Sequence, residues 1–367
     1  MVDIGSGSRY KLCGHPQAVN FGFFTRSFMR ALLSRTVGGP ETLTVDHVDD
    51  PSPAADEVVI DVEACGVNFP DALLIMDKYQ VLPPRPFSPG SEVCGFVSAT
   101  GASVTTLKVG ERVIARCPWG GMAEKLKVSA ERCLRVPTEL PAVELATLQF
   151  TYATAFHALH DRAALREGER LLVLGAAGGI GIAAVELGKA FGAKVFAAAS
   201  SKEKLDFAQE RGADQAILYP AALDESGSKN FAAAIKSAAG PEGIDVVIDP
   251  VGGAYTEAAL RAMGRNGRLL IVGFPAGIAK VPMNLPLLKS CAIVGVDWRS
   301  FNIHEPKRSA NNSRRIIEMY EKGQIAPAVS QIFSLDQAAQ AIRQISQRSA
   351  LGKLAIDMSG SRCLLSR

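Results

Sequence analysis

A cluster of glycines at residues 175–181 stands between an apolar run at 171–174 and a segment whose apolar residues recur at helical spacing. Glycine permits a sharp turn and lets N–H groups at a helix start approach a pyrophosphate, which the helix dipole also attracts. Since residues 194–199 predict a second strand, the unit is predicted to bind a dinucleotide. The spacing is Gly-x-x-Gly-x-x-Gly, whereas the strict dinucleotide motif is Gly-x-Gly-x-x-Gly. A turn that only packs the helix against the sheet is therefore the alternative. The residues assigned to the cofactor are Gly175, Ala177, Gly178, Gly179, Ile180 and Gly181.

Serines and lysines follow the second predicted strand, in the run Ser200-Ser201-Lys202-Glu203-Lys204. A fold that prefers NAD places Asp or Glu directly after this strand, where the carboxylate binds the ribose 2′-hydroxyl. Hydroxyl and ammonium groups at this point instead favour the 2′-phosphate of NADPH. The alternative is a solvated helix start, because serine followed by charged residues is ordinary capping chemistry.

The region continues with strands predicted at residues 245–249, 268–272 and 292–296, which alternate with helices. Predicted helices include residues 142–160 before the glycine cluster, 230–239 within the region and 313–322 after it. This alternation indicates a doubly wound parallel sheet, which binds ligands beyond the carboxyl ends of its strands. Residues at or next to these ends are further candidates for the cofactor site: Asp249, Val251, Gly252, Gly273 and Phe274.

The rest of the chain predicts a second unit. Short strands separated by Gly and Pro fill residues 29–150 and indicate a β-barrel-like domain. The last stretch is too short to be a domain, so we expect it to fold back onto the barrel. The expected parts are an unassigned extension at 1–28, the barrel at 29–150, the dinucleotide unit at 151–296 and the return to the catalytic domain at 297–367.

Composition limits the possible partners and compartments. The chain has 367 residues, 47% of them hydrophobic, and a net charge of +3, which argues against nucleic acid or a membrane as the main partner. Seven scattered cysteines without a C-x-x-C pair indicate a reducing compartment. No apolar run approaches the ~20 residues that span a bilayer. We expect a cytoplasmic protein, or a mitochondrial one if the basic residues 1–28 are a transit peptide.

Six motifs together resemble one family. They are CGVNFPD at 65–71, PGSEVCGFV at 89–97, VGERVIA at 109–115, LGAAGGIG at 174–181, DPVGG at 249–253 and LGK at 351–353. In this order they resemble the zinc-independent branch of the medium-chain dehydrogenase/reductase superfamily, specifically NADPH:quinone oxidoreductases and quinone-oxidoreductase-like proteins. The resemblance implies an α/β fold in which a doubly wound parallel Rossmann sheet is inserted in a GroES-like β-barrel catalytic domain.

Zinc-using relatives carry a cysteine at the position of Asn68 and a histidine at that of Ser91, so only the carboxylate of Glu92 remains here. One carboxylate cannot supply the three protein ligands of catalytic zinc. We therefore expect no metal, and a structural hydrogen bond for Glu92. Alcohol oxidation, which uses zinc to polarise an alkoxide, is disfavoured.

The resemblance also implies residues at both ends of the cofactor. It assigns the 2′-phosphate to Lys204, helped by Ser200 and Tyr219. It places the nicotinamide end near the side chains of Asn68, Asp71, Tyr79 and Thr154 and the backbone around Gly273 and Val296. Lys353 matches a position that often faces the cofactor, and a surface lysine is the alternative there.

The implied reaction is hydride transfer from NADPH to a small hydrophobic quinone or a similar conjugated carbonyl acceptor. Such a reaction needs positioning and exclusion of water more than a catalytic triad. The main alternative is reduction of an enoyl or alkenal C=C bond, with Tyr79 as proton donor. A non-catalytic NADPH-binding or RNA-binding crystallin-like protein is an alternative of another class. The family also implies a homodimer or homotetramer, formed through an edge strand at residues 292–296.

Overall fold

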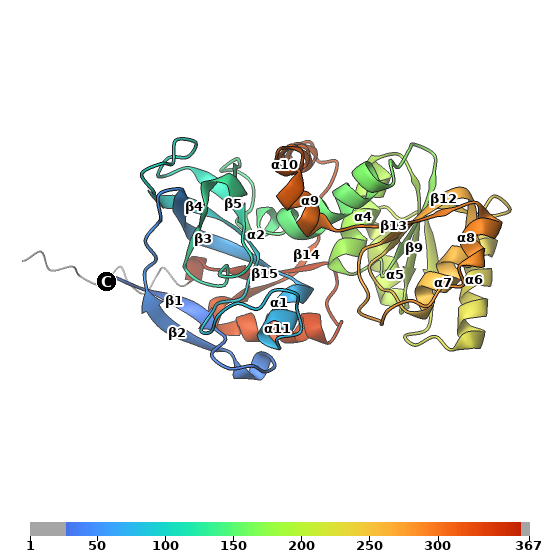
Figure 1. The fold of residues 1–367 in the computed structure, drawn as a ribbon, viewed down its shortest axis with the longest axis horizontal. Helices are drawn as coiled ribbons and strands as arrows, with labels where there is room; N and C mark the ends of the chain where they lie inside the picture. The colour runs from blue at the N-terminus through green and yellow to red at the C-terminus, as the bar shows by residue number, and fades with distance from the viewer. Residues whose placement is uncertain (1–26, 361–367) are drawn as a thin grey trace, which may run out of the picture.

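The chain folds into two β-rich halves at opposite ends of its long axis, as Figure 1 shows. The structure is a computed structural model that describes residues 27–360. Most of the extension predicted at 1–28 therefore lies outside the described residues. Within residues 27–360, no helix combines the length and the apolar character needed to cross a membrane. The cysteines described are free thiols: Cys65, Cys94, Cys117, Cys133 and Cys291.

Mainly antiparallel strands build the first half. Its strands are β1 (Phe28–Leu33), β2 (Thr44–Asp49), β3 (Glu57–Val67), β4 (Glu92–Thr100), β5 (Arg112–Arg116), β6 (Lys125–Ser129), β7 (Cys133–Arg135), β14 (Val329–Ser334) and β15 (Lys353–Asp357). β1 and β2 form a two-stranded sheet, whereas the larger sheet has the order β14-β15-β3-β4-β5-β7, with β6 also paired to β3. Helices α1 (Phe69–Ile75) and α11 (Ala338–Ser346) also belong to this half and pack against each other.

The C-terminal strand completes a sheet that the N-terminal part begins. β15 pairs antiparallel with β3, with Leu354 opposite Val67 and Asp357 opposite Ala64. The dinucleotide unit is thus inserted between two parts of the barrel, and the predicted fold class is confirmed.

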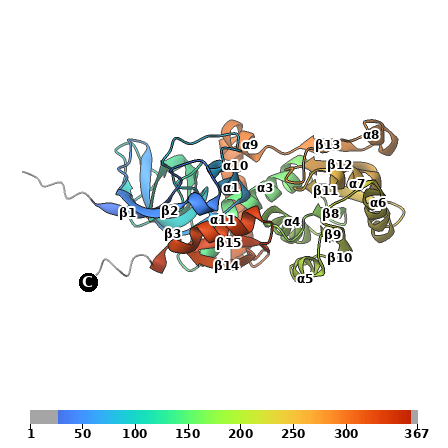
Figure 2. The ribbon, with the colours of Figure 1, turned by 90° about the horizontal axis from the view of Figure 1, so that it is seen from below.

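Six parallel strands build the second half. They are β8 (Arg170–Leu174), β9 (Lys194–Ala199), β10 (Gln215–Leu218), β11 (Ile244–Asp249), β12 (Met263–Ile271) and β13 (Ala292–Gly295). Their order in the sheet, β10-β9-β8-β11-β12-β13, is that of a dinucleotide-binding Rossmann fold. Figure 2 shows the strands side by side in this order. The helices between them are α4 (Gly179–Ala190), α5 (Lys202–Glu210), α6 (Glu225–Ala239), α7 (Ala254–Ala262) and α8 (Asn284–Lys289).

The apolar run of β8 explains why this sheet lies between layers of helices. Leu171 and Val173 belong to one hydrophobic core, and Leu172 and Leu174 belong to another. Successive side chains of a strand point to opposite faces, so a strand that is apolar throughout requires cover on both faces.

Helices connect the two halves. Residues 142–160 were expected to form a helix, and they form a series of turns: α2 (Ala142–Leu145), a π-helical turn η3 (Leu148–Tyr152), α3 (Ala153–Phe156) and a second π-helical turn η4 (His157–Arg162). After β13 the chain returns through α9 (Trp298–His304) and α10 (Pro306–Glu321), which lie between the halves in Figures 1 and 2. Asp161 holds α10 in place by accepting hydrogen bonds from Arg308 Nη2 at 2.8 Å and Asn312 Nδ2 at 2.7 Å.

Two helix starts differ from the expected positions for local reasons. α6 begins at Glu225 instead of residue 230, because the Asp224 side chain caps it by accepting from the N–H of Gly227 at 2.6 Å. α10 begins at Pro306 instead of residue 313, since proline suits the first position of a helix.

Candidate active site

The glycine turn packs tightly between β8 and α4. Gly175 follows β8 with φ of +61°, a conformation that favours glycine. A Cβ on Gly181 would lie 2.1 Å from the carbonyl oxygen of Gly175, so α4 begins directly against the strand end. Gly178 is the N-cap of this twelve-residue helix, and no side chain caps it. The first N–H groups of α4 thus lie at the carboxyl edge of the sheet, where a pyrophosphate fits.

The loop after β11 lies against the glycine turn. A Cβ on Gly175 would meet Val251 Cγ2 at 2.9 Å. Asp249 is fully buried and accepts hydrogen bonds from the N–H groups of Val251 and Gly252, both at 2.8 Å, and from the hydroxyl of Thr256. Asp249 therefore shapes this loop, and its place in the cofactor site stays a prediction.

The loop after β12 extends the same rim. Ala276 donates its N–H to the carbonyl of Val251 at 2.9 Å, so the loops after β11 and β12 are joined. Phe274 at the start of this loop is 59% exposed. Val296 follows β13 and donates its N–H to the carbonyl of Ile271 at 3.0 Å. The structure therefore brings the predicted residues that follow β8, β11, β12 and β13 to one edge of the sheet, Gly273 among them.

Two cationic residues meet at the end of β9. Lys204 Nζ donates to Ser200 Oγ and to the carbonyl oxygen of Arg348, both at 3.4 Å. Ser201 caps α5 by accepting from the N–H of Lys204 at 3.3 Å. The Arg348 guanidinium donates to the carbonyl of Pro275 in the loop after β12. Arg348 is a candidate that the sequence analysis missed, although its place four residues before the glycine of the LGK motif was a signal.

Tyr219 follows β10 and is only 7% exposed. Its ring packs against Tyr255 and Phe231, with ring centroids 4.8 and 5.2 Å away. Burial raises the pKa of its hydroxyl, and the nearby Tyr255 raises it further. Tyr219 is thus a neutral member of an aromatic cluster, and its contact with a 2′-phosphate stays a prediction.

A buried ammonium joins the residues expected at the nicotinamide end. Lys353 is 1% exposed, and its Nζ donates to Asn68 Oδ1 at 2.6 Å, to the carbonyl of Val67 at 3.0 Å and to Glu92 Oε1 at 3.0 Å. An ammonium has three N–H donors, so each donor has its acceptor. The alternative of a surface lysine is wrong, because the side chain points from the start of β15 into the protein interior.

The other polar atoms of this group are also paired. Asn68 Nδ2 donates to Glu92 Oε1 at 2.9 Å and to Ser91 Oγ at 3.4 Å. Glu92 Oε2 accepts the N–H of Phe150 at 2.9 Å. This is the kind of structural hydrogen bond that the sequence analysis expected for Glu92. We call Asn68, Glu92 and Lys353 the ammonium cluster.

Asp71 supports this cluster from behind. Its carboxylate is fully buried and accepts the N–H of Asn68 at 2.7 Å and that of Gly90 at 3.0 Å. Burial raises its pKa from 3.8 to about 6. Asp71 therefore fixes the turn that carries Asn68, and its contact with the nicotinamide end of the cofactor stays a prediction.

Tyr79 and Thr154 are the other two residues predicted at the nicotinamide end. Tyr79 is half-buried, and burial raises the pKa of its hydroxyl, against the influence of nearby Arg299. Thr154 Oγ1 donates back to the carbonyl of Phe150 at 2.6 Å. The ring of Phe150 packs edge-on against Trp298 with centroids 5.7 Å apart. Two aromatic rings thus meet where the halves join.

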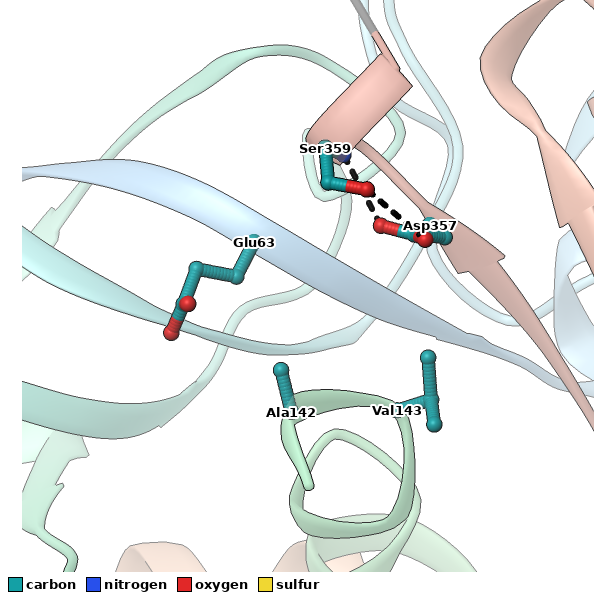
Figure 3. A pocket seen from close by; sticks show the side chains of 5 residues that line it. All are labelled: Glu63, Ala142, Val143, Asp357 and Ser359. Carbon is teal, nitrogen blue, oxygen red and sulfur yellow. Dashed lines mark hydrogen bonds between the residues drawn. The ribbon is translucent and has the colours of Figure 1, made fainter. Parts of the chain in front are cut away.

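A pocket of about 280 Å³ lies elsewhere, between β3, α2 and the end of β15. Figure 3 shows its lining residues, Glu63, Ala142, Val143, Asp357 and Ser359. Glu63 accepts from Arg112 Nε at 2.7 Å, and Asp357 accepts from Ser359. Both carboxylates of this pocket are thus paired with protein neighbours.

Comparison with known proteins assigns the family. Residues 54–138 match the family model described as alcohol dehydrogenase GroES-like domain, and residues 179–312 match the one described as zinc-binding dehydrogenase. The quinone oxidoreductase-like protein 2 homolog of Nematostella vectensis is 34% identical over 336 residues, which cover 90% of each chain. The quinone oxidoreductase of Rattus norvegicus is 31% identical over 334 residues, which cover 90% of this chain and 98% of the relative.

The chain belongs to the quinone oxidoreductase-like group of the medium-chain dehydrogenase/reductase superfamily. It is therefore an oxidoreductase of a family that uses nicotinamide cofactors. A probable oxidoreductase from Mycobacterium abscessus has a TM-score of 0.82 at 33% identity, covering 91% of this chain and 100% of that one. A mycobacterial protein in complex with NADPH has a TM-score of 0.81 at 27% identity, covering 90% and 100%. The CurK enoyl reductase has a TM-score of 0.78 at 26% identity, covering 90% and 99%.

The residues at the family's zinc position do not fit a zinc ion. Catalytic zinc takes three protein ligands from Cys, His, Asp and Glu. Here an amide, a hydroxyl and a carboxylate come together, and the Lys353 ammonium already lies 3.0 Å from that carboxylate. In residues 27–360 there is no group of three or more His, Cys, Asp or Glu that could hold a metal.

Proposed function

We propose that this chain is a metal-free reductase that transfers hydride from NADPH to a quinone or a similar conjugated carbonyl acceptor. The observation that carries the proposal is the Lys353 ammonium, hydrogen-bonded between Asn68 and Glu92. A protein cation stands where alcohol-oxidising relatives need a metal to polarise an alkoxide. An acceptor that is already electrophilic does not need such polarisation. The names of the relatives described above support a quinone as this acceptor.

The cofactor would lie along the carboxyl edge of the six-stranded sheet. The first turn of α4, with Gly178 and Gly179, would hold the pyrophosphate through backbone N–H groups. Lys204, Ser200 and Arg348 would bind the 2′-phosphate, because charged donors bind phosphate oxygens strongly. No carboxylate directly follows β9 to favour a free 2′-hydroxyl, and this supports NADPH over NADH.

Bound NADPH supplies a hydride equivalent, and the chain's own residues orient the reactants and exclude water. The edge-on rings of Phe150 and Trp298 would form an apolar wall suited to a flat hydrophobic acceptor. Tyrosine is protonated at neutral pH, and burial raises the pKa of the Tyr79 hydroxyl further above that range. It could therefore donate a proton to the reduced oxygen, and solvent is the other source.

A substrate panel tests the proposal directly. NADPH and NADH are each combined with 9,10-phenanthrenequinone, 1,4-quinones, alkenals and crotonyl-CoA, and cofactor oxidation is followed by absorbance. We expect turnover of quinones with NADPH in the presence of a metal chelator. Loss of turnover on chelation, or turnover of none of these acceptors, would contradict the proposal.

Gly178→Ala provides a variant that separates cofactor binding from folding. A Cβ at this position makes only an ordinary contact at 3.4 Å, to the carbonyl oxygen of Gly175. The variant should therefore melt at the wild-type temperature, yet bind NADPH at least tenfold more weakly because the methyl group occupies the pyrophosphate site. Unchanged affinity would place the pyrophosphate elsewhere.

Reduction of a C=C bond is the second candidate, and the likeness to the CurK enoyl reductase favours it. Tyr79→Phe separates the two reactions. Protonation of a carbon needs a positioned donor, so loss of the hydroxyl should slow an enoyl or alkenal reduction about 100-fold. A quinol oxygen can take its proton from water, so quinone turnover should change by no more than a few-fold.

We also propose that a second copy of this chain pairs along β13. β13 is the last strand of its sheet, and among the described residues of this chain no strand lies on its outer side. Ile293 on β13 is 38% exposed, and Leu287 and Leu288 on the preceding helix α8 are 78% and 72% exposed. An edge strand can pair with its own copy around a two-fold axis.

Light scattering tests this pairing. It should give the mass of a dimer or tetramer for the wild type and of smaller species for Ile293→Lys. A monomeric wild type would refute the pairing.

A further inference from the structure

We propose that Lys353 is a positioning residue, whose ammonium replaces a metal ion as the cation that orders the nicotinamide end of the site. The inference rests on the proposed function, because it concerns how the same reaction is set up. Because all three ammonium donors of Lys353 are taken by protein acceptors, the residue would act through the groups that it holds.

The first step of the argument is the completeness of the ammonium cluster. The three donors of Lys353 match three acceptors at 2.6–3.0 Å, and Glu92 accepts on both of its oxygens. Asn68 receives Lys353 on its oxygen and donates its amide hydrogens to Glu92 and Ser91, so its amide has one orientation. A buried charge is stable only when it is paired and hydrogen-bonded in this way.

The second step is the fit of the backbone around the cluster. A Cβ on Gly66, which pairs with Glu92 across the sheet, would lie 2.6 Å from Glu92 Oε1. Gly352 has φ of +57°, and a Cβ there would lie 2.3 Å from the carbonyl oxygen of Ala328. The chain therefore carries glycine at the two positions where a side chain would displace either Glu92 or the strand that bears Lys353.

The third step is the contact of Lys353 with the cofactor half. Gly352 donates its N–H to the carbonyl of Ala177 in the glycine turn at 2.7 Å. A Cβ on Gly179, the first residue of α4, would lie 3.2 Å from Lys353 Cδ. Lys353 thus contacts Asn68 on its turn and the Glu92 carboxylate on β4. It also lies against the start of α4, the helix expected at the pyrophosphate. Its displacement would shift the nicotinamide end relative to the phosphate end.

A cycle of three variants tests the role: Lys353→Met, Glu92→Gln and the double variant. Methionine keeps most of the lysine stem and its packing while removing the charge. In Lys353→Met the Glu92 carboxylate is left unpaired, so the melting temperature should fall. We expect kcat for the quinone to fall about 100-fold through misplacement of the reacting groups, with the KM for the quinone nearly unchanged.

The double variant separates positioning from charge neutralisation. It removes both buried charges, so its melting temperature should return toward that of the wild type. If Lys353 only neutralised Glu92, kcat would return as well, and the positioning role would be overturned. We expect kcat to stay low, because Asn68 has lost its lysine donor. Lys229→Met, at a side chain that is 73% exposed on α6, is the matched control and should leave kcat and melting unchanged.

A measurement without substrate distinguishes failure of this inference from failure of the proposed function. NADPH is titrated into each variant, and the emission of the bound dihydronicotinamide is recorded. Lys353→Met and the double variant should keep the wild-type Kd, which depends on the phosphate contacts, but lose the emission change of the bound ring. Wild-type emission in both variants would overturn the role of Lys353, whether or not any quinone is reduced. A wild-type protein that reduces no acceptor would overturn the function alone.

Discussion

At the proposed nicotinamide end, Asn68, Glu92 and Lys353 are buried and hydrogen-bonded to one another at 2.6–3.0 Å. At the proposed phosphate end, Lys204 donates to two partners at 3.4 Å beside an exposed Arg348. The first group has every donor and acceptor occupied by protein. The second keeps ammonium and guanidinium hydrogens available to a ligand. The difference separates a group that positions other residues from a group that can bind a phosphate.

The two groups also respond differently to substitution. In a closed buried cluster, loss of one partner leaves polar atoms without hydrogen bonds in a place that water does not reach. At an exposed edge, loss of one cation leaves the protein stable and changes only its affinity for an anion. Folding and catalysis should therefore change together at the first group, and cofactor affinity alone at the second.

The largest effect is expected for Asn68→Ala. This change removes the acceptor of Lys353 and a donor to Glu92, so both buried charges lose part of their pairing. We expect kcat to fall about 100-fold or more and the melting temperature to fall with it. Asn311→Ala, at an exposed asparagine on α10, is the control. A normal kcat at a lowered melting temperature would show that the cluster only stabilises the fold.

Asp71→Asn tests the buried support of the cluster through pH. The pKa of Asp71 is raised from 3.8 to about 6 by burial, so between about pH 6 and 4 the folded protein takes up a proton that the unfolded chain does not. This carboxyl thus stabilises the folded protein as pH falls through 6, and that contribution is lost as pH rises. A shift of this size corresponds to about 3 kcal/mol.

Urea unfolding at pH 4 and pH 7 measures this contribution, with the variant as reference for all other groups. Relative to Asp71→Asn, the wild type should be more stable at pH 4 than at pH 7 by about 2.4 kcal/mol, because at pH 4 the unfolded chain already binds part of the proton. A difference between the two proteins that does not depend on pH would contradict the raised pKa.

At the phosphate end, Lys204→Ala and Arg348→Ala should each weaken NADPH binding about 10- to 100-fold, which is the range for one charge-assisted hydrogen bond. Their affinity for NADH and their melting temperatures should not change. Lys202→Ala is the control, because this side chain is 85% exposed on the same helix and pairs with Asp206. Equal NADPH and NADH affinities in the wild type would refute the assignment of this edge.

The smallest effect is expected for Ser201→Ala, which removes the cap of α5. Loss of such a cap costs about 1 kcal/mol of stability. Asp224→Ala, which removes the cap of α6 away from the site, should cost a similar amount. Only Ser201→Ala should also weaken NADPH binding, by a few-fold, because it loosens the helix start that carries Lys204. Equal NADPH affinity in both variants would limit Ser201 to capping.

The sequence alone determined the local parts of this protein. The apolar run of β8, the glycine turn and the serine–lysine run after β9 are contiguous, and their structures depend on hydrogen bonds between near neighbours. The strand pattern sufficed for the fold class, since an apolar run in a parallel sheet requires cover on both faces. α6 and α10 begin before the predicted residues. The start of α6 depends on the capping contact of Asp224, and that of α10 depends on the geometry of Pro306.

Only the tertiary structure decided the surroundings of Lys353, Asp71 and Arg348. Lys353 lies 285 residues from Asn68 and 261 from Glu92 in sequence, and its ammonium meets them because β15 pairs with β3. No local pattern distinguishes a lysine that will be buried from one on the surface. Whether its charge is stable inside the protein depends on which acceptors the folded chain brings within hydrogen-bond distance, and that is a property of the assembled sheet.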